Sequence, residues 1–165
     1  MNTGGVNREV WADISIPRIG AVRVTASDNG ITGIRFMKRC AGVKAVPRGA
    51  PPVLHRALHE LRLYAQGRLQ RFTVPVDISG VTGFTRLVLE RTATLPYGTT
   101  ISYGQLASSI GRRGAGRAAG NSLGKNPVPI IIPCHRVIRA DGSAGGYSSG
   151  VRRKKLLLAL EGIPS

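Results

Sequence analysis

The segment "IIIPCHRVI" (residues 130–138) places a cysteine, a histidine and an arginine directly after three isoleucines. Three β-branched residues favour an extended segment, and Pro133, which has no N–H to donate to a sheet, is expected to end it. Because neighbouring side chains of a regular strand point to opposite faces, Cys134 and His135 can act together only if the chain bends at the proline. A thiol attacks as the thiolate, and a nearby histidine and cationic groups lower its usual pKa of ~8.5. The segment therefore predicts a reactive cysteine with His135 as its base.

A third group that orients the imidazole would complete this arrangement. Glu161 lies in the last helix expected from the sequence, and from there its carboxylate can reach His135 directly or through a water molecule. A nucleophile, a base and an orienting group together activate a thiol for covalent chemistry. A structural alternative stays open, in which His135 donates to a backbone carbonyl in the core and Glu161 pairs with a surface lysine or arginine.

The first half of the chain is expected to form a small sheet with one helix. Residues 10–37 alternate in the manner of three strands, and "DNG" makes a tight hairpin turn between the last two. A basic loop with glycine and proline follows at 38–52. Residues 52–68 have apolar side chains at helical spacing, and "FTVPVDI" at 72–78 is a short extended piece. This half ends near residue 80.

The second half is expected to be mainly helical. Its elements are, in order, a helix at 82–95 capped by Thr82, a short helix at 102–111 capped by Ser102, a short helix at 115–126, a buried strand at 128–133, a glycine-rich loop at 139–150 and a closing helix at 151–162. Two short helices joined by a glycine-containing turn predict a helix-turn-helix.

Charge is the strongest signal in the composition. The chain has 24 Lys+Arg against 8 Asp+Glu, a net charge of +16, and 19 of the 24 bases are arginine. Ten basic residues and one acid lie between Arg112 and Lys155, so the positive charge gathers around the cysteine motif. This balance predicts a polyanionic partner, nucleic acid before membrane. An arginine-rich proteome is the alternative explanation.

Length and cysteine content exclude several classes. A chain of 165 residues with 42% apolar side chains fits one domain or two small ones. It has neither a run of ~20 apolar residues nor a secretory signal at its start. Its two cysteines, Cys40 and Cys134, form no disulfide framework and no CxxC zinc motif, so we expect an intracellular protein in the cytoplasm, or in the nucleus of a eukaryote, with no cofactor and no metal. Cys40 with His55 and His59 lacks a recognisable metal-ligand spacing.

The motifs together resemble a known family. "NPVPIIIPCHRVI", preceded by "SYGQLA" and "GRAAG" and followed by "GGY" and "LLLALEG", is similar to the O6-alkylguanine-DNA alkyltransferases (methylated-DNA–protein-cysteine methyltransferases). The resemblance covers residues 81–163, and "YAQGRLQRFTVPVD" agrees more loosely. It implies an α/β (α+β) protein with a supporting, ribonuclease-H-like α/β domain at 1–80. The domain at 81–165 would bind DNA, contain the helix-turn-helix and accept the alkyl group.

The resemblance also implies a reaction. By resemblance, the protein would bind double-stranded DNA through the minor groove as a monomer that can cluster along it. It would flip the damaged guanine out of the stack, which makes O6 accessible. Cys134 would take the alkyl group irreversibly in a single turnover without a cofactor, and O4-alkylthymine is a further candidate substrate.

Site residues follow from the same resemblance. Cys134 would be the acceptor, His135 the base acting through water and Glu161 its orienting group. Tyr103 would rotate the nucleotide and donate toward the guanine ring, and Asn126 would be a hinge between the recognition helix and the cysteine strand. In isolation, core packing is the favoured explanation of Tyr103, and Asn126 is also explained as a helix cap before proline.

Other side chains would hold the flipped base and the duplex. Arg117 would fill the gap left by the base, although alone it is also explained as a solvated charge. Tyr147 and Ser148 would form the pocket wall, Val137 an apolar floor and Lys154 a nearby charge. The remaining candidates share a predicted contact with phosphate, and they are Arg112, Arg113 and Thr85. Phosphate contacts position a protein without specifying sequence, and they make affinity fall with salt.

Three other functions are alternatives to alkyl transfer. A non-catalytic relative that binds alkylated DNA would lack the cysteine. A helix-turn-helix regulator would need a dimer interface and long polar side chains for the major groove, whereas "AGRAAGNSLG" carries few. A cysteine hydrolase would release many products per protein molecule.

Overall fold

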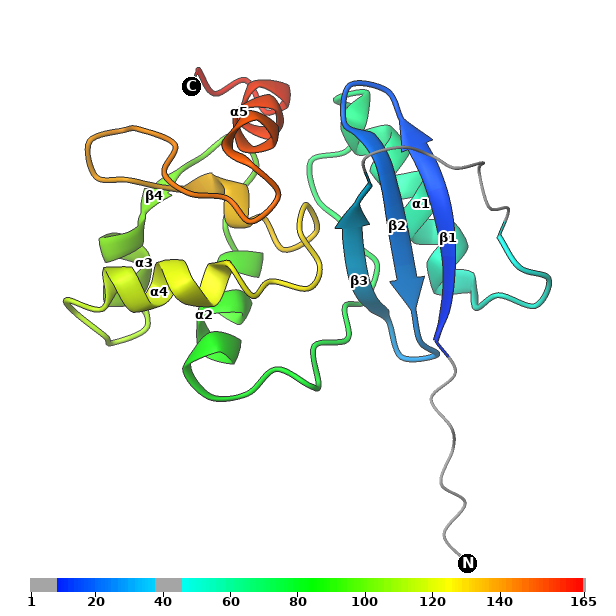
Figure 1. Cartoon of the computed structure of the whole chain (residues 1–165), viewed down its shortest axis with the longest axis horizontal. Helices are drawn as coiled ribbons and strands as arrows, with labels where there is room; N and C mark the ends of the chain where they lie inside the picture. Colours follow the sequence, from blue (N-terminus) through cyan, green and yellow to red (C-terminus); the bar gives the residue numbers. More distant parts are fainter. Residues whose placement is uncertain (1–8, 38–45, 165) are drawn as a thin grey trace, which may run out of the picture.

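The computed structural model describes residues 9–37 and 46–164. Figure 1 shows two groups of elements side by side, a sheet with one helix from the N-terminal half (residues 9–80) and a cluster of helices from the C-terminal half (residues 81–164). Cys40 lies outside the described residues. Within them, no helix is long and apolar enough to span a membrane.

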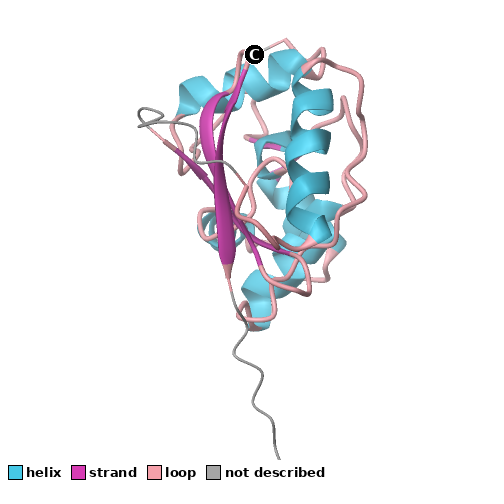
Figure 2. Cartoon of the chain, turned by 90° about the vertical axis from the view of Figure 1, so that its right-hand side faces the viewer, coloured by secondary structure: helices cyan, strands magenta, loops and turns pink. Residues whose placement is uncertain are grey.

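The N-terminal half is built on a three-stranded antiparallel sheet, as the alternating pattern predicts. The strands β1 (Val10–Ile16), β2 (Gly20–Ala26) and β3 (Ile31–Phe36) pair in the order β1-β2-β3. Helix α1 (Pro52–Ala65) begins with proline, whose missing N–H costs nothing at the first helical position. Its apolar side packs on one face of the sheet (Figures 1 and 2). The expected strands and helix are confirmed.

The segment after α1 is fastened to the sheet at one point. Ile31 N donates to Pro75 O at 2.9 Å, and Asp77 N donates to Ile31 O at 2.9 Å. These bonds form an isolated parallel bridge between Ile31 and Val76, and the expected extended piece at 72–78 forms no longer ladder.

The C-terminal half is mainly helical and carries one two-residue strand pair. Its elements are α2 (Gly83–Ala93), β4 (Ile101–Ser102), α3 (Tyr103–Ser109), α4 (Gly116–Leu123), the 3-10 helix η1 (Cys134–Arg136), β5 (Val137–Ile138) and α5 (Val151–Leu160). Ser102 and Gln105 form a capping box at the start of α3, and α3 packs on α4. Thr82 occupies the N-cap of α2 without a side-chain bond.

The strand expected at 128–133 is wrong. This segment is a buried turn in which Ile132 N donates to Val128 O at 3.0 Å and Ile130 has φ +77°, a left-handed conformation that β-branched residues rarely adopt. A strand needs donors and a neighbour to pair with, and three residues here lack an N–H, namely Pro127, Pro129 and Pro133. The turn instead meets the N-terminal half, where Ile34 N of β3 donates to Pro127 O at 2.8 Å.

Candidate functional site

Cys134 opens η1 directly after this turn and lines a pocket of ≈ 950 Å³. Cys134 is only 4% exposed, and it is through this pocket that its sulfur is accessible to solvent. The lining combines one face of α4 with the start of α3 and the glycine-rich loop, and it comprises Tyr103, Gly116, Arg117, Gly120, Asn121, Leu123, Gly124, Lys125, Cys134, Arg139, Gly146, Tyr147 and Ser148. The bend after Pro133 thus brings the cysteine to a cavity, as the sequence predicts.

Asn126 ties the sulfur to the preceding turn. Its Nδ2 donates to Ile132 O at 2.9 Å and to Cys134 Sγ at 3.2 Å, and its Oδ1 accepts from Val128 N at 3.0 Å. One amide therefore closes both ends of the turn and places the thiol. It joins a turn, not the strand that we expected, to the end of α4.

The electrostatic environment of the thiol differs from expectation. Burial raises the pKa of Cys134 above its ordinary value, and the Asn126 amide, the Tyr147 side chain and the charge of Lys154 oppose this only in part. The charge of Lys154 lowers the pKa as expected, but desolvation outweighs it, so the expected net lowering of the pKa is wrong for the free protein. The resting thiol is protonated near neutral pH and needs a base when it reacts.

Behind the thiol, Glu161 collects five hydrogen bonds. Its Oε1 lies 2.8 Å from His135 Nε2 and accepts from Tyr64 Oη at 2.7 Å and from Arg136 Nη2 at 2.9 Å. Its Oε2 accepts from Arg136 Nε at 2.8 Å and from Gly98 N at 3.1 Å. Burial alone would raise the pKa of Glu161, but the bonds from His135 and Arg136 lower it to about 2. The carboxylate is buried and ionised, so the surface-pair alternative is wrong.

This network assigns the protonation of His135. An ionised carboxylate only accepts hydrogen bonds, so Nε2 must carry a proton. Burial lowers the pKa of His135 despite the nearby Glu161, so the ring is neutral and Nδ1 bears a lone pair. Nδ1 is buried and has no hydrogen-bond partner among the described residues. The ring is thus oriented as a base with its free nitrogen available.

Lys154 is fully buried beside the pocket. Its Nζ donates to Val137 O at 2.5 Å and to Gly146 O and Tyr103 Oη at 3.4 Å each. Burial lowers its pKa to about 8. The ammonium therefore links α5, β5, the glycine-rich loop and the pocket tyrosine. Burial, and then the nearby Cys134, raise the pKa of Tyr103, which keeps its hydroxyl a donor.

The residues predicted to contact DNA or the flipped base lie in three places. Arg117 and Ser148 are exposed and line the pocket, and Arg112 and Arg113 are exposed in the turn between α3 and α4. Thr85 is half-buried and shares a 3.2 Å hydrogen bond with Ser122 of α4, away from the pocket.

Val137 does not provide the expected apolar floor of the pocket. Its side chain is fully buried in the core, and the residue contributes its carbonyl oxygen to Lys154 instead. Two pocket cations, Lys125 and Arg139, were missed, because isolated bases in a basic chain carry no distinguishing signal. Tyr64 and Arg136 were missed as partners of Glu161. Adjacency to His135 was the available signal for Arg136, and for Tyr64 it was the position at the start of "YAQGRLQRFTVPVD", which agrees loosely with the family.

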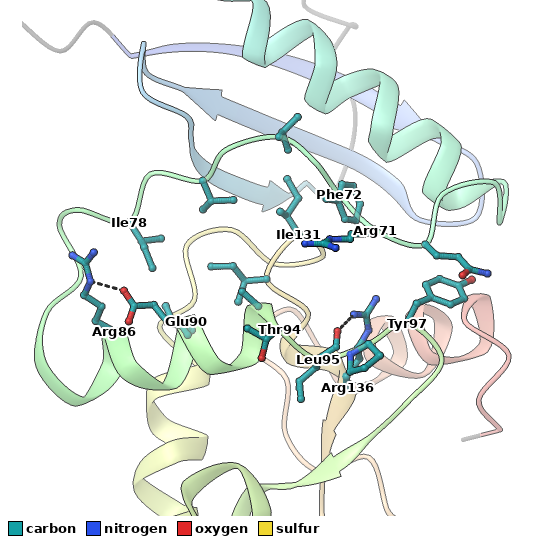
Figure 3. A pocket seen from close by; sticks show the side chains of 17 residues that line it. Arg71, Phe72, Ile78, Arg86, Glu90, Thr94, Leu95, Tyr97, Ile131 and Arg136 are labelled. Carbon is teal, nitrogen blue, oxygen red and sulfur yellow. Dashed lines mark hydrogen bonds and ion pairs between the residues drawn. The ribbon is translucent and has the colours of Figure 1, made fainter. Parts of the chain in front are cut away.

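A second cavity of ≈ 860 Å³ lies on the other side of the turn, between the two halves (Figure 3). Phe72 and Ile78 line it from the N-terminal half, and Tyr97 and Ile131 from the other. None of the site residues predicted from the sequence lines it. Arg136 reaches its edge, where Nη1 donates to Leu95 O at 2.5 Å.

Metal-ligating side chains do not gather in the described part of the chain, where no group of three His, Cys, Asp or Glu residues could hold an ion. His55 and His59 are exposed on α1. Cys40, the third member of that candidate set, lies outside the described residues.

Known proteins share both the sequence and the fold. Residues 83–163 match the family model of the 6-O-methylguanine DNA methyltransferase DNA-binding domain. A methylated-DNA–protein-cysteine methyltransferase of Methanothermobacter thermautotrophicus is 38% identical over 145 residues, 86% of this chain and 80% of the relative. The protein of that name from Mycobacterium tuberculosis is 46% identical over 111 residues, 67% of each chain.

Solved structures agree. The crystal structure of Mycobacterium tuberculosis OGT in complex with DNA has 36% identity and a TM-score of 0.80, covering 94% of this chain and 95% of that one. The fold and the similarity to these proteins define the class of this chain. It is an α/β protein that carries a DNA-binding domain of the 6-O-methylguanine methyltransferase type. Within that class, the chain belongs to the methylated-DNA–protein-cysteine methyltransferase family.

Proposed function

We propose that this protein repairs DNA by moving the alkyl group of O6-alkylguanine onto Cys134 Sγ. The observation that carries the proposal is the position of the sulfur, which lines an open pocket while an oriented, neutral His135 and an ionised Glu161 lie behind it. A pocket of this kind suits a planar base, because apolar walls and a few convergent polar groups fix its orientation.

The chemistry is one displacement. The thiol proton passes to His135 Nδ1, for which we propose a bridging water because no direct bond joins the sulfur to that nitrogen. The thiolate forms the S–C bond as the C–O6 bond breaks, and its electron pair stays on guanine, where Tyr103 donates a hydrogen bond. The proton released by the thiol is the one that guanine gains overall. The thioether on Cys134 has no route back, so each molecule acts once.

DNA would be bound by the face that carries α3 and α4, acting as a helix-turn-helix. Arg117 is exposed on α4 among alanines and glycines, which allow close approach to a minor groove, and it borders the pocket into which the base flips. Arg112 and Arg113 would contact phosphate. A phosphate contact of Thr85 stays a prediction, as do a ribonuclease-H-like first domain, a boundary near residue 80 and a monomer that clusters on DNA.

Mass spectrometry tests the proposal. After incubation with a duplex containing O6-methylguanine, one methyl group should add about 14 Da to the peptide that contains Cys134, as expected for an alkylated nucleophile. Cys134→Ser should abolish the shift and retain DNA binding.

Three outcomes would contradict it. More than one guanine repaired per protein would indicate turnover, as in a hydrolase. Modification at another residue would reject Cys134 as the acceptor. Tight lesion binding without any transfer would support a non-catalytic damage-binding protein.

A further inference from the structure

One member of the Glu161 network comes from the opposite half of the molecule. Tyr64 belongs to α1, is fully buried and donates its hydroxyl to Glu161 Oε1 at 2.7 Å. The same hydroxyl oxygen lies 3.4 Å from His135 Nε2. Since α1 otherwise packs on the N-terminal sheet, this phenol is a direct link between that half and the catalytic base.

We propose that Tyr64 is a positioning residue for alkyl transfer, which fixes Glu161 and thereby keeps His135 protonated at Nε2 with Nδ1 free. The proposal rests on the proposed function. It assigns the N-terminal half a part in the reaction beyond supporting the fold.

The direction of the hydrogen bond follows from charge. Burial, and then the negative charge of Glu161, raise the pKa of Tyr64, so the phenol stays neutral. An ionised carboxylate has no proton to give, so Tyr64 donates to Glu161. The lone pairs of the phenol then face His135 Nε2, which also favours a proton on that nitrogen. Both partners of His135 Nε2 are therefore acceptors, and the tautomer with Nδ1 protonated would leave Nε2 without a hydrogen to offer them.

The hydroxyl also moderates the charge felt by the imidazole. Glu161 Oε1 accepts hydrogen bonds from three donors, His135, Arg136 and Tyr64. Arg136 is charged and His135 is the base itself, so Tyr64 is the neutral donor from outside the cysteine motif. Removal of this donor concentrates the charge on His135. A more negative partner stabilises the imidazolium, so the pKa of His135 should rise.

The ring of Tyr64 has a separate, structural part. It packs against Phe72 with ring centroids 5.4 Å apart and edge-on to Tyr97 at 6.2 Å. Replacement by phenylalanine keeps these contacts and removes only the hydroxyl. Tyr97→Phe is the matched control, because the hydroxyl of Tyr97 also bonds the end of α5, at Leu160 O (2.9 Å), and does not bond the Glu161 side chain.

The experiment measures the single-turnover rate of methyl transfer against pH for the full chain and both variants. Tyr64→Phe should lower the rate at neutral pH about 10-fold, as for loss of a group that orients a general base, and should move the acid limb to higher pH by roughly 0.5 unit. Tyr97→Phe should leave the acid limb in place. DNA affinity should not change in either variant.

The outcomes separate the two proposals. If the wild-type protein transfers no methyl group, the proposed function is wrong. If it does and Tyr64→Phe has the wild-type rate and acid limb, the positioning role is wrong. A shift of the limb in both variants would indicate a general loosening of α5 and would also reject it.

A measurement on the unsubstituted protein covers the case in which Tyr64→Phe does not fold. NMR of the protein with ¹⁵N-labelled histidine should show a neutral His135 ring protonated at Nε2, with the exposed His55 and His59 as internal references. A ring protonated at Nδ1, or at both nitrogens at neutral pH, would overturn the inference.

Discussion

At the scale of single residues, the site keeps its nucleophile protonated until it is used. Burial raises the pKa of Cys134 and lowers that of His135, so neither carries charge in the free protein near neutral pH. Glu161 and Arg136 carry the charges instead, and two hydrogen bonds pair them with each other. In the proposed reaction, His135 therefore takes the thiol proton as the sulfur forms its bond to the alkyl carbon.

The ion pair between Glu161 and Arg136 should be costly to break. Both residues are 5% exposed, and removal of one partner leaves a buried charge uncompensated. Glu161→Gln should therefore lower the free energy of unfolding by about 3–5 kcal/mol in urea titrations at neutral pH. Glu90→Gln is the control. It breaks an exposed 2.8 Å pair with Arg86 and should cost about 0–1 kcal/mol. Equal costs would contradict the assignment.

The same carboxylate predicts how stability depends on acid. Glu161 has a pKa of about 2 in the folded protein against an ordinary 4.5, so the unfolded chain takes up this proton first. Its contribution is complete above pH 4.5 and is lost as the pH falls from there toward 2. Urea titrations across this window should show a shallower loss of stability for Glu161→Gln than for the wild type.

At the scale of elements, the site depends on segments without regular structure. The turn at 126–134 presents the thiol, and the glycine-rich loop closes the pocket against Tyr103. Hydrophobicity predicted the burial of Ile130 and Ile132 correctly, whereas Ile131 is half-buried and lines the second cavity. An apolar run does not distinguish a buried strand from a buried turn. The available signal for the turn was the three prolines at 127, 129 and 133, which would remove donors from the same edge of a strand.

The loop contact with Tyr103 can be tested with a pair of glycines. Gly145 (φ +69°) and Gly142 (φ +83°) both have left-handed backbones, so alanine at either should cost about 1–2 kcal/mol. A Cβ at Gly145 would lie 3.0 Å from Tyr103 Oη, whereas one at Gly142 would meet nothing within 4 Å. Gly145→Ala should slow methyl transfer about 10- to 100-fold, as for a catalytic group displaced by about 1 Å.

Gly142→Ala serves as the control for backbone strain and should retain the wild-type rate. Single-turnover kinetics and thermal unfolding of both variants separate the two effects. Equal transfer rates in the two variants would show that Tyr103 does not need its observed position.

At the scale of the whole molecule, contacts of Ile34 and Tyr64 join the two halves at the site. Ile34 of β3 donates its backbone N–H to Pro127 O in the turn that precedes the thiol, and Tyr64 of α1 donates its hydroxyl to Glu161. The net charge of +16 acts at this scale too, because it favours association with DNA wherever a lesion lies.

The salt dependence of DNA affinity should distinguish arginines that bind phosphate from arginines that lie far from the DNA. The double variant Arg112→Ala, Arg113→Ala should reduce the slope of log K against log salt by about 2, because each phosphate that a base no longer neutralises lowers the slope by roughly 0.9. Arg62→Ala, Arg68→Ala makes the same change in net charge on exposed side chains at the end of α1 and should leave the slope nearly unchanged. Binding isotherms at several salt concentrations provide the measurement, and equal slopes for the two double variants would reject phosphate binding at the α3–α4 turn.

The sequence by itself determined the three N-terminal strands, the main helices, the basic character of the chain and the neighbouring positions of Cys134 and His135, because periodicity, charge and short motifs are local properties. The family resemblance added Glu161 to this pair. Only the tertiary structure decided the protonation of the thiol, which depends on how completely other segments exclude water from it. The same holds for Tyr64 and Ile34, which reach the site from distant positions in the chain. Long-range packing brings such partners together, and the residues around each partner in the sequence do not show which distant side chain it will meet.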